Sequence, residues 1–283
     1  MTIDTQQSIS KSASSFFLGT LLSRITGMVR DMALAFFFGS GVFISAFMVA
    51  YRFANLFRRI FGETALQAGF VPHFESIKSS CPKKAVGFYR DLFFTMFCVL
   101  ALVVLGCEAL MVSVSYFNFS PGVKQIIFLT ELMFPGLIFI CLYSLNSSLM
   151  QCEKKYFLPA VAPAFFNFIW IIAAYSFRKV DPERAVVNLS LATLFAFFCQ
   201  WAMTSFSGVS LFSVHLRSQD FFKPNFFSSG LKEMVKPMSL GVIGISAVQI
   251  NTAVDAFFAR AADPSGPAYL WYAMRIHQLP LAL

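Results

Sequence analysis

The sequence predicts an all-α polytopic membrane protein, and its composition and its long apolar segments are the observations behind this prediction. Of the 283 residues, 57% are hydrophobic and only 13% are charged, whereas soluble domains carry about 25% charged residues. The mean hydropathy is +0.68. Apolar stretches long enough to cross a bilayer, which requires about 20 residues, recur along the whole chain.

Eight such stretches are expected to form transmembrane helices. The intervening segments have turn chemistry, as in Gly39-Ser40-Gly41 and Asp181-Pro182, because Gly, Pro, Ser and Asp interrupt helices. We predict one complete six-helix lobe over 1–212, a cytoplasmic connecting segment over 213–234 and the first two helices of a second lobe over 235–283. The expected spans are 13–38, 42–61, 86–114, 126–150, 157–177, 186–212, 235–262 and 267–283.

The distribution of positive charge predicts the orientation. With a cytoplasmic N-terminus, the inner loops carry eleven lysines and arginines and the outer loops five, as the positive-inside rule requires. The connecting segment pairs Phe221 and Phe222 with Lys223. An interfacial amphipathic helix and an ordinary cytoplasmic loop both fit this pattern.

Six arginines interrupt the otherwise apolar spans. A charge at the centre of a bilayer costs about 2.5–3.5 kcal/mol on insertion scales, and arginine does not lose its proton. These side chains are therefore expected to face a wet cavity or an anionic partner. The arginines are Arg24, Arg30, Arg52, Arg58, Arg59 and Arg275.

Helical spacing suggests how these arginines are grouped. Ser45, Arg52 and Arg59 follow one another at steps of seven, with Asn55 on nearly the same face. Arg24 and Arg30 are six residues apart and therefore lie on different faces of an ideal helix. A bend at Gly27 would bring them toward one cavity, and Asp31 would be able to neutralise Arg30. Snorkelling to the membrane surface is the alternative, and it is weakest for Arg24, Arg52 and Arg275.

Several function classes lack support in the sequence. There is no phosphate-binding loop and no hydrolase or metalloprotease motif, so we expect no enzyme activity. The six cysteines and three histidines show no metal-ligand spacing, and we expect no metal site and no cofactor. The net charge of +8 fits anionic phospholipid better than nucleic acid. Cations without buried carboxylates favour an anionic cargo, and guanidinium groups bind phosphate as a two-pronged fork.

The chain also contains an internal similarity. Residues 31–52 and 255–275 both begin with an acid, contain an Ala-Phe-Phe cluster and a Ser-Gly turn, and end with an arginine. Chance similarity between apolar runs is an open alternative to a true repeat. A repeat unit of six helices implies a second lobe, so we expect the sequence to be a truncated form of a larger protein.

Specific motifs resemble the MurJ (MviN) lipid II flippase family, within the MATE-like flippase and exporter superfamily. Residues 23–31 match the pattern S-R-x-x-G-x-x-R-D, and residues 46–72 follow the family pattern that includes N-L-x-R-R. Tyr272-Ala273 with Arg275 resembles the eighth helix of the family. The resemblance covers essentially the whole chain.

The resemblance implies a fold, a cargo and a set of site residues. The fold would be two six-helix lobes around a cationic cavity, with two further helices. The cargo would be lipid II, the undecaprenyl-pyrophosphate-linked peptidoglycan precursor, moved across the bacterial inner membrane with possible help from the cell-wall synthesis machinery. The implied pyrophosphate ligands are Arg24, Arg30, Arg58 and Arg275, and the supporting cavity residues are Arg52, Arg59, Ser45 and Asn55.

Three positions depart from the family pattern. Ser45 replaces an acid, Ala54 replaces a proline and Gln278 replaces an acid. These changes remove an expected ion pair or bend. Two other functions remain open, namely a MATE-like exporter of another cargo and a non-transporting remnant or interaction protein.

Overall fold

A computed structural model describes residues 3–59, 64–212 and 223–282. Ten α-helices account for the regular structure of these residues, which contain no strand. All-α architecture is thus confirmed. The helices are α1 (Ile3–Phe38), α2 (Val42–Arg58), α3 (Thr64–Ser80), α4 (Pro82–Ser115), α5 (Pro121–Met133), α6 (Gly136–Cys152), α7 (Phe157–Phe177), α8 (Pro182–Phe212), α10 (Ser229–Ala262) and α11 (Gly266–Ala282).

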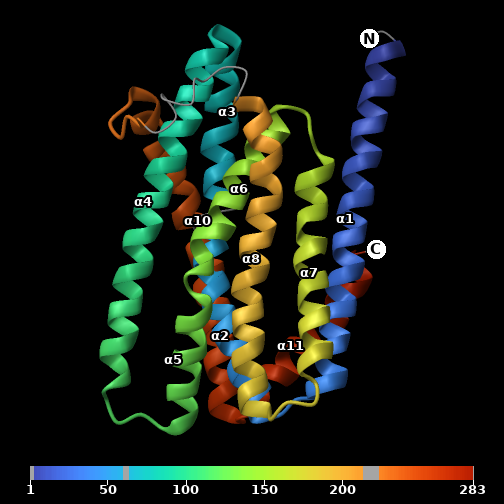
Figure 1. Cartoon of the computed structure of the whole chain (residues 1–283), viewed down its shortest axis with the longest axis vertical. Helices are drawn as coiled ribbons and strands as arrows, with labels where there is room; N and C mark the ends of the chain where they lie inside the picture. The colour runs from blue at the N-terminus through green and yellow to red at the C-terminus, as the bar shows by residue number, and fades with distance from the viewer. Residues whose placement is uncertain (1–2, 60–63, 213–222, 283) are drawn as a thin grey trace.

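The helices run up and down between two ends of an elongated bundle (Figure 1). The turns at 39–41, 116–120, 178–181 and 263–265 lie at the end opposite the N-terminus. Helices α2 and α3 follow one another in the same direction, and so do α5 and α6. The predicted turns therefore separate antiparallel segments, as expected for a chain that crosses a membrane repeatedly.

Two expected features of the bundle need correction. The span expected over 126–150 consists of α5 and α6, which are bent by 44° at a short break. Pro135 lies in this break and cannot donate a backbone hydrogen bond, so it interrupts the helix. Residues 64–80, which had no predicted structure, form α3.

Hydropathy alone identifies fewer spans than the eight expected. Four helices in the described part of the chain, α4, α7, α8 and α10, are long and apolar enough to cross a membrane, and the bent pair α5 and α6 adds a fifth candidate. The arginine-bearing helices α1, α2 and α11 are outside this set. Of the connecting segment over 213–234, residues 213–222 lie outside the described residues, and α10 begins within the remainder, at Ser229.

An aromatic cluster in the core fixes the position of α2. Phe47 is fully buried on α2 and lies 5.4 Å from the fully buried Trp170 of α7, measured between ring centroids. Tyr51 of α2 lies 4.9 Å from the same ring. Phe166 then connects this group to Phe197 of α8 at 5.0 Å. One face of α2 is thus held in the core, which leaves its other face free to carry polar groups.

Close packing of small residues joins α1 to α7. A Cβ atom added at Gly19 would lie 2.7 Å from the Cβ of Ala160, so the two helices meet at a point that admits no larger side chain. Further along, Asn167 of α7 donates hydrogen bonds to the backbone oxygen of Ser23 at 3.1 Å and to the hydroxyl of Thr26 at 3.2 Å. This contact sets the position of the arginine-bearing part of α1.

The start of α10 is anchored to α3 and α4. The backbone N–H of Asn225 donates to a carboxylate oxygen of the buried Asp91 at 2.9 Å. A Cβ atom added at Gly230 would meet the Phe88 ring at 2.9 Å. His73 of α3 lies 3.6 Å from the carboxylate of Glu233. These contacts hold α10 beside α3 and α4, and α10 and α11 together form a wall next to α2.

We predict that Gly19→Ala lowers the stability of the protein. The added Cβ atom would overlap Ala160, and overpacking of this kind costs about 1–3 kcal/mol. Gly106→Ala on α4 is the matched control, because no heavy atom lies within 4 Å of its added Cβ. Thermal unfolding in detergent should show a lower Tm for Gly19→Ala than for the control. Equal Tm values would contradict the described packing of α1 on α7.

Candidate functional site

A pocket lies between α2, α10 and α11. Its volume is about 180 Å³. Among the described residues that line it, none carries a carboxylate. The lining residues are Tyr51, Arg52, Asn55, Leu56, Arg58, Arg59, Gln249, Thr252, Trp271, Met274 and Arg275.

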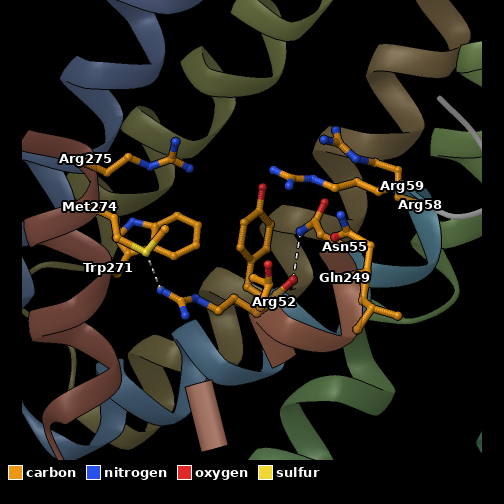
Figure 2. Close-up of a pocket in the computed structure, with 11 residues that line it drawn as sticks. Arg52, Asn55, Arg58, Arg59, Gln249, Trp271, Met274 and Arg275 are labelled. Carbon is orange, nitrogen blue, oxygen red and sulfur yellow. Dashed lines mark hydrogen bonds between the residues drawn. The ribbon is translucent and has the colours of Figure 1, made fainter. Parts of the chain in front are cut away.

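Four of the six predicted arginines line this pocket. Arg52, Arg58 and Arg59 come from α2 and its C-cap, and Arg275 comes from α11. Figure 2 shows the Arg58–Arg59 pair and Arg275 on opposite sides of the pocket. The structure thus brings together side chains that are more than 200 positions apart. Because four cations and, among the described residues, no carboxylate line the pocket, its lining is attractive to an anion.

Trp271 separates two of these cations. Its ring centroid is 5.4 Å from the guanidinium carbon of Arg52 and 4.6 Å from that of Arg275, and the indole lies between the two side chains in Figure 2. The negative faces of an aromatic ring attract cations by about 0.5–1 kcal/mol. Trp271 therefore offsets part of the repulsion between Arg52 and Arg275 without neutralising either charge.

Asp31 connects Arg275 to Arg30 of α1. One Asp31 carboxylate oxygen lies 3.0 Å from Nε of Arg275, and the other accepts from Nε and Nη2 of Arg30 at 3.0 and 2.8 Å. Arg30 also donates to Asn167 at 2.9 Å and lies over the Trp170 ring. Arg30 is 7% exposed and does not line the pocket. Arg30 instead contacts Asp31, and Asp31 in turn contacts the pocket residue Arg275.

Arg24 is placed apart from the pocket. It lies on the exposed surface of α1 and is not among the lining residues. The expected bend at Gly27 does not interrupt α1, which is one continuous helix. Arg24 and Arg30 therefore stay on different faces, as their six-residue spacing predicts.

Ser45 also lies away from the pocket, at the end of α2 near the 39–41 turn. Its hydroxyl donates to the backbone oxygen of Ser265 at 2.9 Å and accepts from the backbone N–H of Ala268 at 3.1 Å. Tyr272 donates to the backbone oxygen of Gly39 at 3.0 Å. These bonds join α2 to the start of α11. We call Ser45, Ser265 and Ala268 the α2–α11 clasp.

Sequence reasoning did not identify Trp271, Gln249 or Thr252 as site residues. Trp271 precedes Arg275 by four residues, and such pairs face each other on a helix, so a signal for Trp271 was present. Gln249 and Thr252 line the pocket because α10 packs beside α2. The sequence carries no signal for that long-range contact.

The chain is similar in sequence to a known protein family. A family model described as MurJ, lipid II flippase MurJ, matches residues 34–283. Curated relatives named "Probable lipid II flippase MurJ" include one from Chlamydia pneumoniae, 32% identical over 99% of this chain and 50% of its own length, and one from Chlamydia muridarum, 31% identical over 100% and 52%. The chain spans about half the length of the curated relatives it matches.

Solved structures agree in fold. "Lipid II flippase MurJ, inward closed conformation" superposes with a TM-score of 0.75 at 24% identity, covering 95% of this chain and 55% of that one. A MOP superfamily transporter from Pyrococcus furiosus superposes with a TM-score of 0.63 at 14% identity, over 97% and 60%. The family model covers well over half of the chain, and the chain therefore belongs to the lipid II flippase MurJ family.

Proposed function

We propose that the chain binds the pyrophosphate of lipid II and takes part in moving this lipid from the cytoplasmic to the periplasmic leaflet of the bacterial inner membrane. The observation that carries the proposal is the convergence of Arg52, Arg58, Arg59 and Arg275 on one pocket without a lining carboxylate. A diphosphate carries at least two negative charges. It is able to accept bidentate hydrogen bonds from several guanidinium groups at once.

The arginines would divide the work of binding. Arg58 of α2 and Arg275 of α11 line the pocket from different helices and would hold the two phosphate groups, while Arg52 and Arg59 would add further positive charge. Arg30 would act through Asp31, which fixes Arg275. Arg24 lies outside this pocket, so its proposed role in binding the diphosphate would require the ligand to reach the exposed side of α1.

We also propose the membrane arrangement. Eight crossings would place the N-terminus in the cytoplasm, with a six-helix lobe over 1–212, a connecting segment over 213–234 and the start of a second lobe over 235–283. The alternation of turns between the two ends of the bundle supports this proposal, and the excess of basic residues in the inner loops favours contact with anionic phospholipid.

The α2–α11 clasp would close the outer end of the pocket. It joins the proposed first lobe to the proposed second lobe at the end away from the N-terminus. Release of a lipid headgroup on that side would require these hydrogen bonds to break. The side chain that forms these hydrogen bonds is the hydroxyl of Ser45 rather than a carboxylate. Breaking the clasp would therefore involve no protonation of this residue.

We predict that Arg58→Gln and Arg275→Gln each weaken lipid II binding by about tenfold or more, because charge-assisted hydrogen bonds contribute about 1.5–3 kcal/mol. Arg184→Gln is the matched control, since Arg184 is exposed and lies outside the pocket. Titration of the purified chain in detergent by native mass spectrometry measures the three affinities.

Two outcomes of this titration would count against the proposal. Equal lipid II affinities for all three variants would show that Arg58 and Arg275 do not contribute to binding. Tight binding of a lipid-linked sugar that lacks any phosphate would favour a MATE-like exporter with another cargo.

We predict that Ser45→Ala loosens the contact between α2 and α11. The substitution removes the two hydrogen bonds of the Ser45 hydroxyl, to the Ser265 backbone oxygen and from the Ala268 N–H, which keeps its bond to the Ser265 oxygen. Each lost bond contributes about 0.5–1.5 kcal/mol. Hydrogen–deuterium exchange of the 263–272 segment should become faster. Ser246→Ala is the matched control, because the Ser246 hydroxyl bonds only within α10, to the backbone oxygen of Val242. Unchanged exchange in Ser45→Ala would show that the clasp does not hold this end closed.

A further inference from the structure

The pocket contains a buried hydrogen-bond acceptor that an anion does not satisfy. Nδ2 of Asn55 donates to the backbone oxygen of Tyr51 at 2.8 Å. Only the amide nitrogen is able to donate to a carbonyl, so this bond fixes which way the amide faces. Oδ1 of Asn55 is buried and has no hydrogen-bond partner in the described structure. Figure 2 shows this oxygen turned away from the bonded nitrogen.

A phosphate group is the wrong partner for this oxygen. Ionised phosphate oxygens accept hydrogen bonds, and so does the amide oxygen, so the two repel each other. A buried acceptor that stays unpaired costs about 1–3 kcal/mol. The group that satisfies Asn55 must therefore bring an O–H or N–H of its own.

The adjacent wall of α10 has the same neutral, polar character. Gln249 is 6% exposed, lines the pocket and offers an amide with both donors and an acceptor. The Thr252 hydroxyl donates to the backbone oxygen of Val248 at 3.0 Å, so its oxygen remains able to accept from a ligand. A neutral group rich in hydroxyls or amides suits this wall better than a second anion does.

Arg52, about one turn from Asn55 on α2, has the reverse need. Nη1 of Arg52 is buried without a hydrogen-bond partner, and this donor requires an acceptor such as a phosphate oxygen. The pocket volume of about 180 Å³ keeps these two groups close together. The group that pairs with Asn55 is thus directly attached to the anion rather than remote from it.

We propose that Asn55, Gln249 and Thr252 form a subsite for the first sugar on the diphosphate, so that the chain distinguishes a glycosylated polyprenyl diphosphate from a bare one. This inference rests on the proposed function, because it takes the diphosphate to lie against the arginines. The donor to Asn55 is a sugar hydroxyl or an acetamido N–H. A bare diphosphate leaves Asn55 unpaired and binds less tightly.

The test compares two ligands and two variants of equal shape. The ligands are a polyprenyl diphosphate and its N-acetylhexosaminyl ester of the same chain length. Asn55→Thr keeps an oxygen that accepts a hydrogen bond, whereas Asn55→Val has the same shape without it. Both substitutions are β-branched and affect the helix alike. Asn251→Ala, at an exposed position of α10 outside the pocket, is a further control.

We expect the unmodified chain and Asn251→Ala to prefer the glycosylated ligand by about tenfold, a preference typical of one buried hydrogen bond. Asn55→Thr should retain most of this preference, and Asn55→Val should reduce it to less than about twofold. Asn55→Thr and Asn55→Val should bind the bare polyprenyl diphosphate with the same affinity. That equality would also show that the pocket is intact in both variants. Native mass spectrometry in detergent provides all the affinities.

The outcomes separate the inference from the proposed function. If the unmodified chain binds neither ligand, the proposed function fails. If it binds both ligands equally, or if Asn55→Thr and Asn55→Val prefer the glycosylated ligand to the same degree, the sugar subsite is overturned and diphosphate binding stands. Loss of the preference for the glycosylated ligand in Asn55→Val alone supports the subsite.

Discussion

The arrangement of the site depends on the buried carboxylate of Asp31. Its two carboxylate oxygens engage different arginines, Arg30 on its own helix and Arg275 on α11. The Arg30–Asp31 pair is buried, and removing one partner of such a pair costs about 3–5 kcal/mol. Arg275 is 42% exposed, so its pair with Asp31 joins α11 to α1 more weakly. One negative charge shared by two cations also leaves a net positive charge. Asp31 therefore positions Arg275 without cancelling the attraction of the pocket for an anion.

Helix α2 connects this charge network to the core. Its buried face, with Phe47 and Tyr51, packs against Trp170 of α7, and Arg30 lies over the same ring. Arg52 and Asn55 are on the side of α2 that lines the pocket. The aromatic core thus sets the rotation of α2, and that rotation decides which side chains meet the ligand. Cations in an apolar segment are tolerated because packing, rather than hydropathy, keeps the helix in place.

The helical segments were largely predictable, and the membership of the site was only partly so. Span 157–177 is confirmed to the residue, because apolar length and flanking turns are local properties. The break at Pro135 required tertiary context, since proline is tolerated within α7, at Pro163, but ends a helix here. Arg52 and Arg59 line the pocket as their shared stripe suggested. The same stripe includes Ser45, which bonds to α11 instead, because helical spacing fixes a face but not the neighbour along its length.

The two similar segments, 31–52 and 255–275, contact each other in the structure. Asp31 of the first pairs with Arg275 of the second, and Nη2 of Arg52 donates to the sulfur of Met274 at 3.9 Å. Both arginines contact the ring of Trp271. The Asp31–Arg275 pair thus joins residues 244 positions apart. In the proposed function, a diphosphate that binds Arg275 would compete with Asp31 for the same guanidinium group. Its binding energy would therefore be linked to the contact between α1 and α11.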